Sequence, residues 1–364
     1  MSGPVVAVLR SFAELDSLQN DWSALGGRFA TPLLDHDWFA CAAQAFHRES
    51  DLHIVIVRHA GELTAVAPMA VDSAGRLAIV GSRALNEPGG LLYASDAALE
   101  SLTAALLRTG RAIVLDRVEA GSALHQRLAR LTRWHGVTFT RETASSHAVP
   151  TNTTWPQYLD SLSSRTKTAL HNARARAERE TGPVRFETLS PSPQQVEAAL
   201  DQLVQIEARG WKARNGSALA TRPEQLQFFL GYARRAAAKD RVRLSIVRFG
   251  DRAVAAELAV TAYGRMWGLK LAYDERFAGC APALQLVHHS IASANAAGLS
   301  AYEFLGSAES WQERWRPERR RYRVSVVYPF STTALITAVH DAASRYSRWV
   351  AGLKQAAALA GDSD

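Results

Sequence analysis

An internal repeat is the feature that most constrains the fold of this sequence. The tripeptide Ile56-Val57-Arg58 reappears at positions 246–248, and after a gap of one residue the segment 66–71 aligns with 255–260. In both copies, apolar residues alternate along successive segments that are separated by turn residues, which is the pattern of β-strands. Such self-similarity predicts a duplication. We therefore expect two units, each with a strand-rich centre.

The apolar pattern around the repeat predicts a mixed α/β chain. Strands are expected at residues 5–9, 52–58, 62–71, 77–80, 112–116 and 137–140, and again at 184–189, 242–249, 253–262, 266–273, 301–305 and 322–327. Helices are expected at residues 13–25, 97–108, 123–133, 155–181, 193–212, 223–239 and 282–297, and over the C-terminal end. The small, polar, proline-containing stretch 144–154 indicates a linker. Each half thus has a mixed central sheet flanked by helices.

Length and composition agree with two globular domains. The 364 residues exceed the size at which a single core usually stops growing, which is roughly 250–300 residues. Hydrophobic residues make up 47% of the chain and charged residues 21%, as in folded enzymes. We therefore predict one domain at residues 1–145 and a second at residues 155–364.

Charge and cysteine content limit the partners. The net charge of +7 favours an anionic partner, such as the phosphates of coenzyme A, nucleic acid or an anionic membrane face. Only Cys41 and Cys280 are present, without a metal-binding spacing, so neither a disulfide framework nor a metal site is expected. The sequence has no apolar run of membrane-spanning length and no leader-like start, which favours a soluble cytoplasmic protein.

A phosphate-binding loop is predicted in the second half. The segment 276–281 reads Arg-x-x-Gly-x-Ala and stands between a strand and a helix that begins with Pro282. Free backbone N–H groups and the positive end of the helix dipole can bind a pyrophosphate there, and Gly279 permits its close approach. The matching segment of the first half, 84–90, carries Glu87 where the phosphate would lie. We therefore expect the first domain to be a degenerate copy.

The sequence resembles a known family at several points. The segments that carry the resemblance are 207–212 (Glu-Ala-Arg-Gly-Trp-Lys), Tyr273-Asp274, Ala281-Pro282-Ala283, 303–306 (Glu-Phe-Leu-Gly) and 311–315 (Trp-Gln-Glu-Arg-Trp), with Pro32, Trp38 and 66–68 in the first half. They are similar to the FemAB-like, cellulose-biosynthesis-associated group of tandem GNAT acyltransferases, which has the Arg-x-x-Gly-x-Ala loop at this junction. Two departures are Ala281-Pro282-Ala283 where the group often has Ser-Pro-Gly, and Trp311-Gln312 where it often has Tyr-Lys.

The resemblance implies a bacterial enzyme that transfers an acyl group to an amine or similar nucleophile. The acyl donor would be acetyl-CoA or a longer acyl-CoA, no metal would be needed, and the acceptor would be a small molecule, a peptide or a cell-envelope precursor. The residues expected to bind the donor are Arg276, Gly279, Cys280, Ala281 and Ala283, and those expected to bind the acceptor are Trp211, Lys212, Tyr273 and Glu303.

Three carboxylates are candidates for the general base. Glu257 interrupts the apolar strand expected at 253–262, and the sequence alignment places Pro68 opposite it in the first copy. An acid at this position either takes a proton from the acceptor or is a solvent-facing residue of an edge strand. Glu207 would share a helical face with Trp211, and Asp274 lies at a strand end, where a turn or cap role is equally natural.

Two other functions remain open from the sequence. The expected helix 155–181 is basic, and FemAB-type ligases use aminoacyl-tRNA as donor, so tRNA is the alternative partner. A non-catalytic module of exopolysaccharide biosynthesis is the third reading. The sequence does not fix the oligomeric state. It contains no nucleophile-elbow, P-loop or His-Glu-x-x-His pattern, which excludes those classes of hydrolase, nucleotide triphosphatase and metalloprotease.

Overall fold

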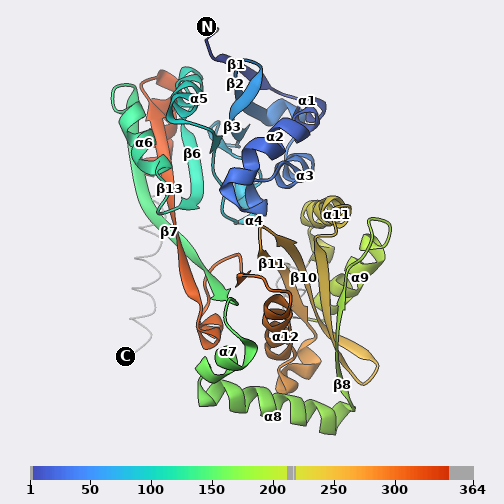
Figure 1. The fold of residues 1–364 in the computed structure, drawn as a ribbon. Coiled ribbons are helices and arrows are strands. Elements are labelled where there is room, and N and C mark those ends of the chain that lie inside the picture. Colours follow the sequence, from blue (N-terminus) through green and yellow to red (C-terminus); the bar gives the residue numbers. More distant parts are fainter. Residues whose placement is uncertain (1–2, 211–215, 217–218, 344–364) are drawn as a thin grey trace, which may run out of the picture.

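The computed structural model describes residues 3–210, residue 216 and residues 219–343 (Figure 1). The strands of this part of the chain are β1 (Val5–Leu9), β2 (Leu52–His59), β3 (Glu62–Val71), β4 (Leu77–Ile79), β5 (Leu92–Tyr93), β6 (Ile113–Glu119), β7 (Gly136–Pro150), β8 (Val184–Leu189), β9 (Val242–Phe249), β10 (Arg252–Ala262), β11 (Arg265–Tyr273), β12 (Ala301–Glu303) and β13 (Glu318–Pro329). The helices are α1 (Phe12–Ser17), α2 (Gln19–Gly26), α3 (His36–Phe46), α4 (Ser82–Leu85), α5 (Asp96–Arg108), α6 (Leu124–Thr132), α7 (Trp155–Ser161), α8 (Ser164–Thr181), α9 (Val196–Glu207), α11 (Pro223–Ala237) and α12 (Pro282–Ala296), and residues 332–343 are also helical.

One continuous sheet runs through both halves of the molecule. Its order is β1-β2-β3-β4-β6-β13-β7-β12-β11-β10-β9-β8, with β5 paired to β3. The strands β4 and β6 are parallel, as are β11 and β12, and the other pairs are antiparallel. The predicted mixed α/β fold is therefore correct.

The two halves repeat the same topology. The order β1-β2-β3-β4-β6 matches β8-β9-β10-β11-β12, and in both halves a helix connects the two parallel strands. The hairpins also share a β-bulge, since Thr64 is skipped between β2 and β3 and Val254 is skipped between β9 and β10. Thr64 and Val254 are as far apart in the sequence as Ile56 and Ile246, so the bulge occurs at the same position of both repeats.

The repeated register corrects one detail of the sequence alignment. Val55 pairs with Ala67 in the first hairpin, and Ser245 pairs with Glu257 in the second. Ala67 is therefore the counterpart of Glu257, and the assignment of Pro68 was wrong. The β2–β3 hairpin aligns with the β9–β10 hairpin without a gap. The one-residue gap in the sequence alignment therefore belongs after β3 and β10.

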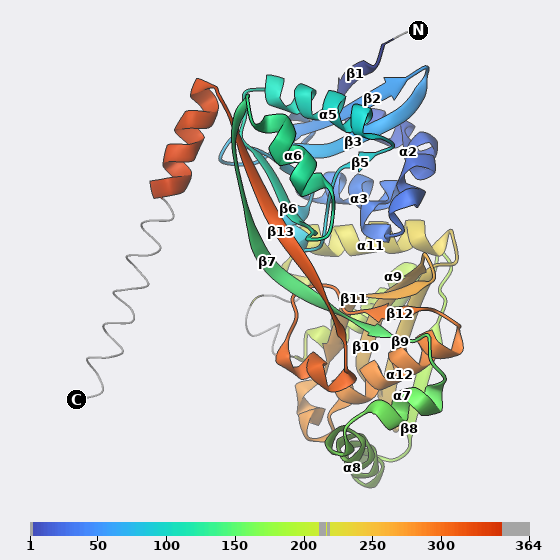
Figure 2. The ribbon, with the colours of Figure 1, turned by 60° about the vertical axis from the view of Figure 1, so that its left-hand side comes forward.

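The halves exchange strands at their junction. Strand β7, from the first half of the chain, pairs with β12 through its last residues, 148–150, while β13, from the second half, pairs with β6. The long strands β7 and β13 also pair with each other and form the connection that is visible between the halves in Figure 2. The linker predicted at 144–154 was therefore wrong, because its residues up to Pro150 belong to β7. The domain boundaries at 145 and 155 stay a prediction, and β13 shows that the two halves share strands.

Three predicted helices differ in the structure. The helix expected at 13–25 is divided into α1 and α2, with Leu18 between them. The helix expected at 155–181 is split into α7 and α8, because Leu162 and Ser163 have extended backbones and the Ser163 hydroxyl caps α8 by accepting the Thr166 N–H. The helix expected at 193–212 ends at Glu207. The sequence also missed α3, which packs against α11 of the second half: the Trp38 ring lies 4.9 Å from Phe228, centroid to centroid, with an edge-to-face geometry.

Alternation along β10 directs its side chains to two different layers. Ala256, Leu258 and Val260 belong to the hydrophobic cluster that includes residues of α9 and α11. Ala255 and Ala259 pack in the clusters that contain residues of α12. Because successive side chains of a strand point to opposite faces, Glu257 is directed to the α12 face.

Candidate active site

A pocket of about 640 Å³ opens where β11 and β12 diverge. These parallel strands pair only over three register positions, from Arg265 opposite Ala301 to Trp267 opposite Glu303. The residues that line this cavity, which we call the central pocket, are Glu87, Glu207, Gly210, Glu257, residues 268–273, Ala278, residues 281–284, Tyr302, Phe304, Leu305, Gly306, Glu309, Trp311, Gln312 and Arg314. The pocket therefore joins the ends of the diverging strands to the start of α12.

Glu257 lies in the wall of the central pocket and is 2% exposed. The Ser290 hydroxyl of α12 donates a hydrogen bond to Glu257 Oε2 at 2.5 Å, and the Tyr302 hydroxyl of β12 donates to Glu257 Oε1. Burial raises the pKa of Glu257 to about 7, although both hydrogen bonds lower it. The strand β10 is central, between β9 and β11, so the alternative of a solvent-facing acid on an edge strand was wrong.

Gly268 of β11 leaves room for this carboxyl group. A Cβ atom at position 268 would lie 2.8 Å from Glu257 Oε1 and 2.9 Å from the Tyr302 hydroxyl oxygen. The register between β10 and β11 also shifts here, because Leu258 pairs with Lys270 and Ala259 pairs with Gly268. The glycine and the bulge together let the buried Glu257–Tyr302 pair fit between the strands.

The predicted phosphate loop forms a short 3₁₀ helix, η5 (Glu275–Cys280), followed by α12. Ala281 and Ala283 line the central pocket, and Ala281 has a left-handed backbone with φ of 45°. No side chain caps the start of α12, so its first turn presents the positive end of the helix dipole to the pocket.

Arginines of two elements lie beside this loop. The Arg276 guanidinium donates hydrogen bonds to Asp274, with Nη2 at 2.5 Å from Oδ2. The Arg176 guanidinium of α8 would be 3.0–3.1 Å from a Cβ atom at position 279, so it lies directly against Gly279. The Cys280 thiol is buried and donates to Glu180 Oε2 at 3.6 Å. Both guanidinium groups at the loop are paired with carboxylates, Arg276 with Asp274 and Arg176 with Glu180, while Cys280 faces α8.

The Asp274 carboxylate accepts hydrogen bonds from the Arg276 guanidinium. Burial alone would raise its pKa, but the hydrogen bonds and charge of Arg276 outweigh that effect and hold the pKa below its usual range. Its carboxylate also accepts the Arg276 backbone N–H and thereby caps η5. Asp274 is not among the residues that line the central pocket, and we do not retain it as a base.

Glu207 lies in the central pocket, on the α9 side of the sheet. Its Oε2 accepts the Leu219 N–H at 2.7 Å, and its Oε1 is 3.9 Å from Lys270 Nζ. Because Glu207 and Glu257 line the same cavity from opposite sides of the sheet, the pocket passes between the diverging strands. Helix α9 ends at Glu207. Trp211 and Lys212 lie outside the described residues, so the helical face expected for Glu207 and Trp211 stays a prediction.

The two remaining predicted residues lie in different places. Tyr273 lines the central pocket, at the end of β11. Glu303 is buried beside a smaller neighbouring cavity, where its Oε1 pairs with Arg265 at 3.2 Å and Arg320 at 3.3 Å. The structure therefore brings Glu257, Glu207, Tyr273, Ala281 and Ala283 together in the central pocket. Arg276, Gly279, Cys280 and Glu303 do not line it.

Sequence reasoning missed three residues of the site. Tyr302 and Ser290 bind Glu257 from elements far along the chain, and Glu87 reaches the central pocket from the first half. No local signal singles out Tyr302 or Ser290. Glu87 was noticed as an acid in the first phosphate-like loop, but its position in the pocket of the other half follows only from the strand exchange.

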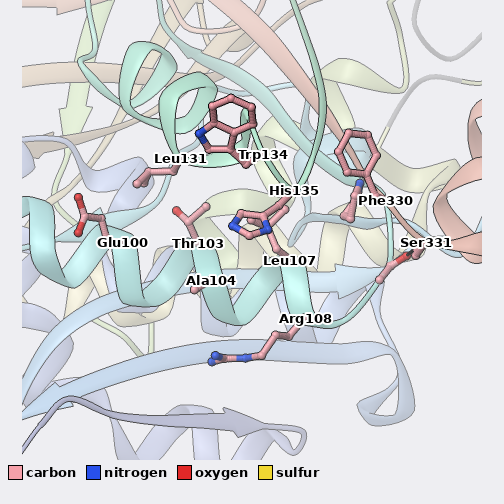
Figure 3. Close-up of a pocket in the computed structure, with 12 residues that line it drawn as sticks. Glu100, Thr103, Ala104, Leu107, Arg108, Leu131, Trp134, His135, Phe330 and Ser331 are labelled. Atoms are coloured by element: carbon pink, nitrogen blue, oxygen red, sulfur yellow. Dashed lines mark hydrogen bonds between the residues drawn. The ribbon is translucent and has the colours of Figure 1, made fainter.

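A larger cavity of about 800 Å³ lies in the first half and is a poor match to this chemistry. Figure 3 shows Trp134, His135 and Phe330 gathered above α5, which contributes Thr103 and Leu107. None of the predicted site residues lines this cavity. Among the described residues, no group of histidine, cysteine and acidic side chains could hold a metal ion, and no helix is long and apolar enough to span a membrane.

Comparison with known proteins finds one family model that matches part of the chain. Residues 164–313 match the family described as acetyltransferase (GNAT) domain. This range contains η5, α12, Glu257 and Tyr302, so the second half of the chain is an acyltransferase domain. No curated protein sequence is significantly similar to the chain.

Solved structures are similar over nearly the whole chain. FemX has a TM-score of 0.58 and 13% identity, with 90% of this chain and 98% of that chain covered. The C-terminal domain (DUF2156) of a putative lysylphosphatidylglycerol synthetase from Agrobacterium fabrum has a TM-score of 0.57 and 12% identity, covering 92% and 97%. L-PGS from Bacillus licheniformis has a TM-score of 0.55 and 11% identity, covering 91% and 96%.

At these identities the similarity concerns the fold. Together with the repeated topology and the domain match over residues 164–313, it shows that the chain has a FemAB-like, tandem GNAT fold with an acetyltransferase (GNAT) domain in its second half. The resemblance seen in the sequence is thereby confirmed, and an enzyme is supported over a non-catalytic module.

Proposed function

We propose that this protein transfers an acyl group from acetyl-CoA or a longer acyl-CoA to an amine of a small molecule, a peptide or a cell-envelope precursor. The observation that carries the proposal is the layout of the central pocket, which connects the start of α12 to the buried carboxyl group of Glu257. Acyl-CoA needs a site for its pyrophosphate, and an amine acceptor needs a base. The pocket reaches from the start of α12, next to the loop, to the Glu257 carboxyl group.

The pyrophosphate is assigned to the loop before α12. The backbone around Gly279 and the first turn of α12 supply N–H groups and the positive helix dipole. Arg176 lies against Gly279, so its guanidinium adds a charge-assisted contact for a phosphate oxygen. The thioester then extends along the pocket toward Glu257.

Glu257 is assigned the role of general base. An alkyl ammonium cannot attack a thioester until it loses a proton, and a carboxylate with a pKa of about 7 can accept one near neutral pH. The freed amine nitrogen bonds to the carbonyl carbon, and the carbon–sulfur bond breaks. The products are an amide and CoA, and the thiolate takes up a proton as it leaves.

Aminoacyl-tRNA is the second candidate donor, because α8 is rich in basic residues. Its charges are partly neutralised, however, since Arg174 pairs with Glu178 at 2.9 Å and Arg176 pairs with Glu180 at 2.7 Å. Any ligand whose phosphates bind Arg174 or Arg176 would have to compete with these two pairs. The match of residues 164–313 to an acetyltransferase (GNAT) domain favours acyl-CoA, and we therefore prefer it as the donor.

Calorimetry and steady-state kinetics test the proposal. Acetyl-CoA should bind with one site per chain, and Gly279→Glu should abolish that binding because its carboxylate occupies and repels the phosphate position. Glu257→Gln should keep acetyl-CoA affinity but lower kcat by roughly 10²–10⁴-fold, the usual contribution of a general base.

Two results would contradict this assignment. Binding of acetyl-CoA at two equivalent sites, or unchanged binding by Gly279→Glu, would remove the pyrophosphate from the loop. Tight, salt-sensitive binding of aminoacyl-tRNA that disappears in the Arg174→Ala, Arg176→Ala double variant would make tRNA the donor.

A further inference from the structure

The first half of the chain places an acid inside the pocket of the second half. Glu87 lies in the connection between β4 and α5, which corresponds to the connection between β11 and α12 that contains the phosphate loop. It lines the central pocket together with Glu207 and Glu257. The loop that lost its phosphate-binding character therefore faces the site of the other half.

A network of contacts fixes Glu87 in this position. Both of its carboxylate oxygens accept the Gly306 N–H, at 3.1 and 2.9 Å. Arg117, which is 1% exposed, donates one hydrogen bond to Asn86 O and another to Gly306 O, both at 2.6 Å. Arg117 therefore ties the loop of the first half directly to the chain segment after β12.

The backbone at this contact is held in unfavourable conformations. Positive φ angles occur at Asn86 (55°), which directly precedes Glu87, at Leu305 (37°), which directly precedes Gly306, and at Arg117 (50°). Such conformations cost on the order of 1–3 kcal/mol each and persist only where the surrounding structure enforces them. The position of Glu87 is thus built into the fold.

The charge lining the pocket favours a cation. Its ionisable side chains include four glutamates, Glu87, Glu207, Glu257 and Glu309, but only Lys270 and Arg314 as permanent cations. This local excess of acids contrasts with the net charge of +7 for the whole chain. Burial raises the pKa of Glu87 to about 7, although the Gly306 hydrogen bond and the charges of Arg117 and Lys270 lower it. An added cation beside Glu87 would stabilise its ionised form.

We infer that Glu87 binds the ammonium group of the acceptor before Glu257 takes up its proton, so that the first half of the chain determines specificity for a cationic primary amine. The inference rests on the proposed acyl transfer, because it assigns the acceptor to the same pocket. The donor phosphates lie at the α12 end, near Arg176, and the acceptor lies at the Glu87 end. Donor and acceptor are therefore recognised by opposite charges from opposite halves.

Glu87→Gln tests this role with little disturbance, because the amide oxygen can still accept the Gly306 N–H. The control is Glu62→Gln, which removes an exposed acid at the start of β3. Probes are n-butylamine and its uncharged isostere n-butanol, with acetyl-CoA as donor. Thiol release gives KM for each acceptor, and calorimetry without donor gives the affinity for n-butylammonium.

The expected result is a KM for n-butylamine that rises at least about tenfold in Glu87→Gln, as for loss of a charged hydrogen-bond partner. The Kd for acetyl-CoA should stay unchanged, and Glu62→Gln should match the wild type. A merely structural role predicts no selective loss of the amine, so an unchanged KM for n-butylamine would overturn the inference.

Calorimetry separates this inference from the donor assignment. If the wild type binds no acetyl-CoA, the proposed donor is wrong, but n-butylammonium should still bind the wild type and bind Glu87→Gln more weakly. If n-butylammonium binds both proteins equally, or binds neither, Glu87 is not the ammonium site, whatever the donor is.

Discussion

Replacing Tyr302 by phenylalanine isolates the hydrogen bond that keeps Glu257 ionisable. Tyr302 is buried, and its hydroxyl donates to Glu257 Oε1, while Ser290 donates to Oε2. Both hydrogen bonds lower the pKa of Glu257 against the effect of burial. The variant removes one of the two donors and leaves the rest of the ring in place, so it should raise the pKa of Glu257.

The magnitude follows from the strength of one hydrogen bond to a charged group. Such a bond contributes about 1.5–3 kcal/mol, and one pKa unit corresponds to about 1.4 kcal/mol, so the pKa should rise by roughly 1–2 units. Starting from about 7, the ionised fraction at neutral pH would fall from about one half to roughly 1–10%. Activity near pH 7 should therefore drop roughly 5–50-fold and recover in alkaline solution.

The assay is the pH dependence of kcat/KM for acetyl transfer, from about pH 6 to about pH 10. Tyr158→Phe is the matched control, since its hydroxyl is also buried but donates to the backbone oxygen of Trp315 rather than to Glu257. The reasoning fails if the acidic limb of the Tyr302→Phe profile stays where it is in the wild type. A loss of activity that is equal at every pH would also refute it, because that pattern indicates a packing defect.

Two further predictions concern the stability of this site. Because the folded-state pKa of Glu257 is raised from 4.5 to about 7, its contribution to stability is present below about pH 4.5 and is lost as the pH rises through 7. Urea unfolding of Glu257→Gln should therefore show a smaller decline between about pH 5 and pH 8, by on the order of 3 kcal/mol; parallel curves would contradict the raised pKa. Gly268→Ala should destabilise the protein by about 1–3 kcal/mol and reduce acetyl transfer, because its methyl group would lie 2.8 Å from Glu257 Oε1. Gly121→Ala, with nothing within 4 Å of the added Cβ, is the control for thermal unfolding.

The strands of the repeat could be predicted because each carries its own local signal. The strands β2, β3, β9 and β10 are rich in apolar residues that are buried on both faces of the sheet, and turn residues separate the two strands of each hairpin. Helix α3 lacks such a signal. Nine of its 11 residues are buried, including His36 and Asp37, so it has no polar face that would mark a surface helix.

A residue of the candidate site could be predicted where the local sequence pattern singles it out. Glu257 interrupts an apolar strand, and Ala281 precedes a helix that begins with proline. No local sequence pattern singles out Tyr302 or Glu87, because their contacts join distant parts of the chain. Tyr302 and Glu257 are 45 positions apart, and Glu87 and Gly306 are 219 positions apart. Asp274 was predicted from its position at a strand end, but in the structure its carboxylate is paired with the neighbouring Arg276.

The strand exchange explains why the two halves cannot be treated as independent enzymes. The domain matched at 164–313 contains the phosphate loop and Glu257, but residues 148–150 of β7 pair with β12, the strand that carries Tyr302. The same junction brings Glu87 to the central pocket through Gly306. A duplicated domain that had lost its phosphate loop would be free to change, yet this copy contributes a sheet strand and a pocket wall to its partner. Under the proposed function, the first half forms one wall of the active site, and acceptor recognition depends on the contact between the halves.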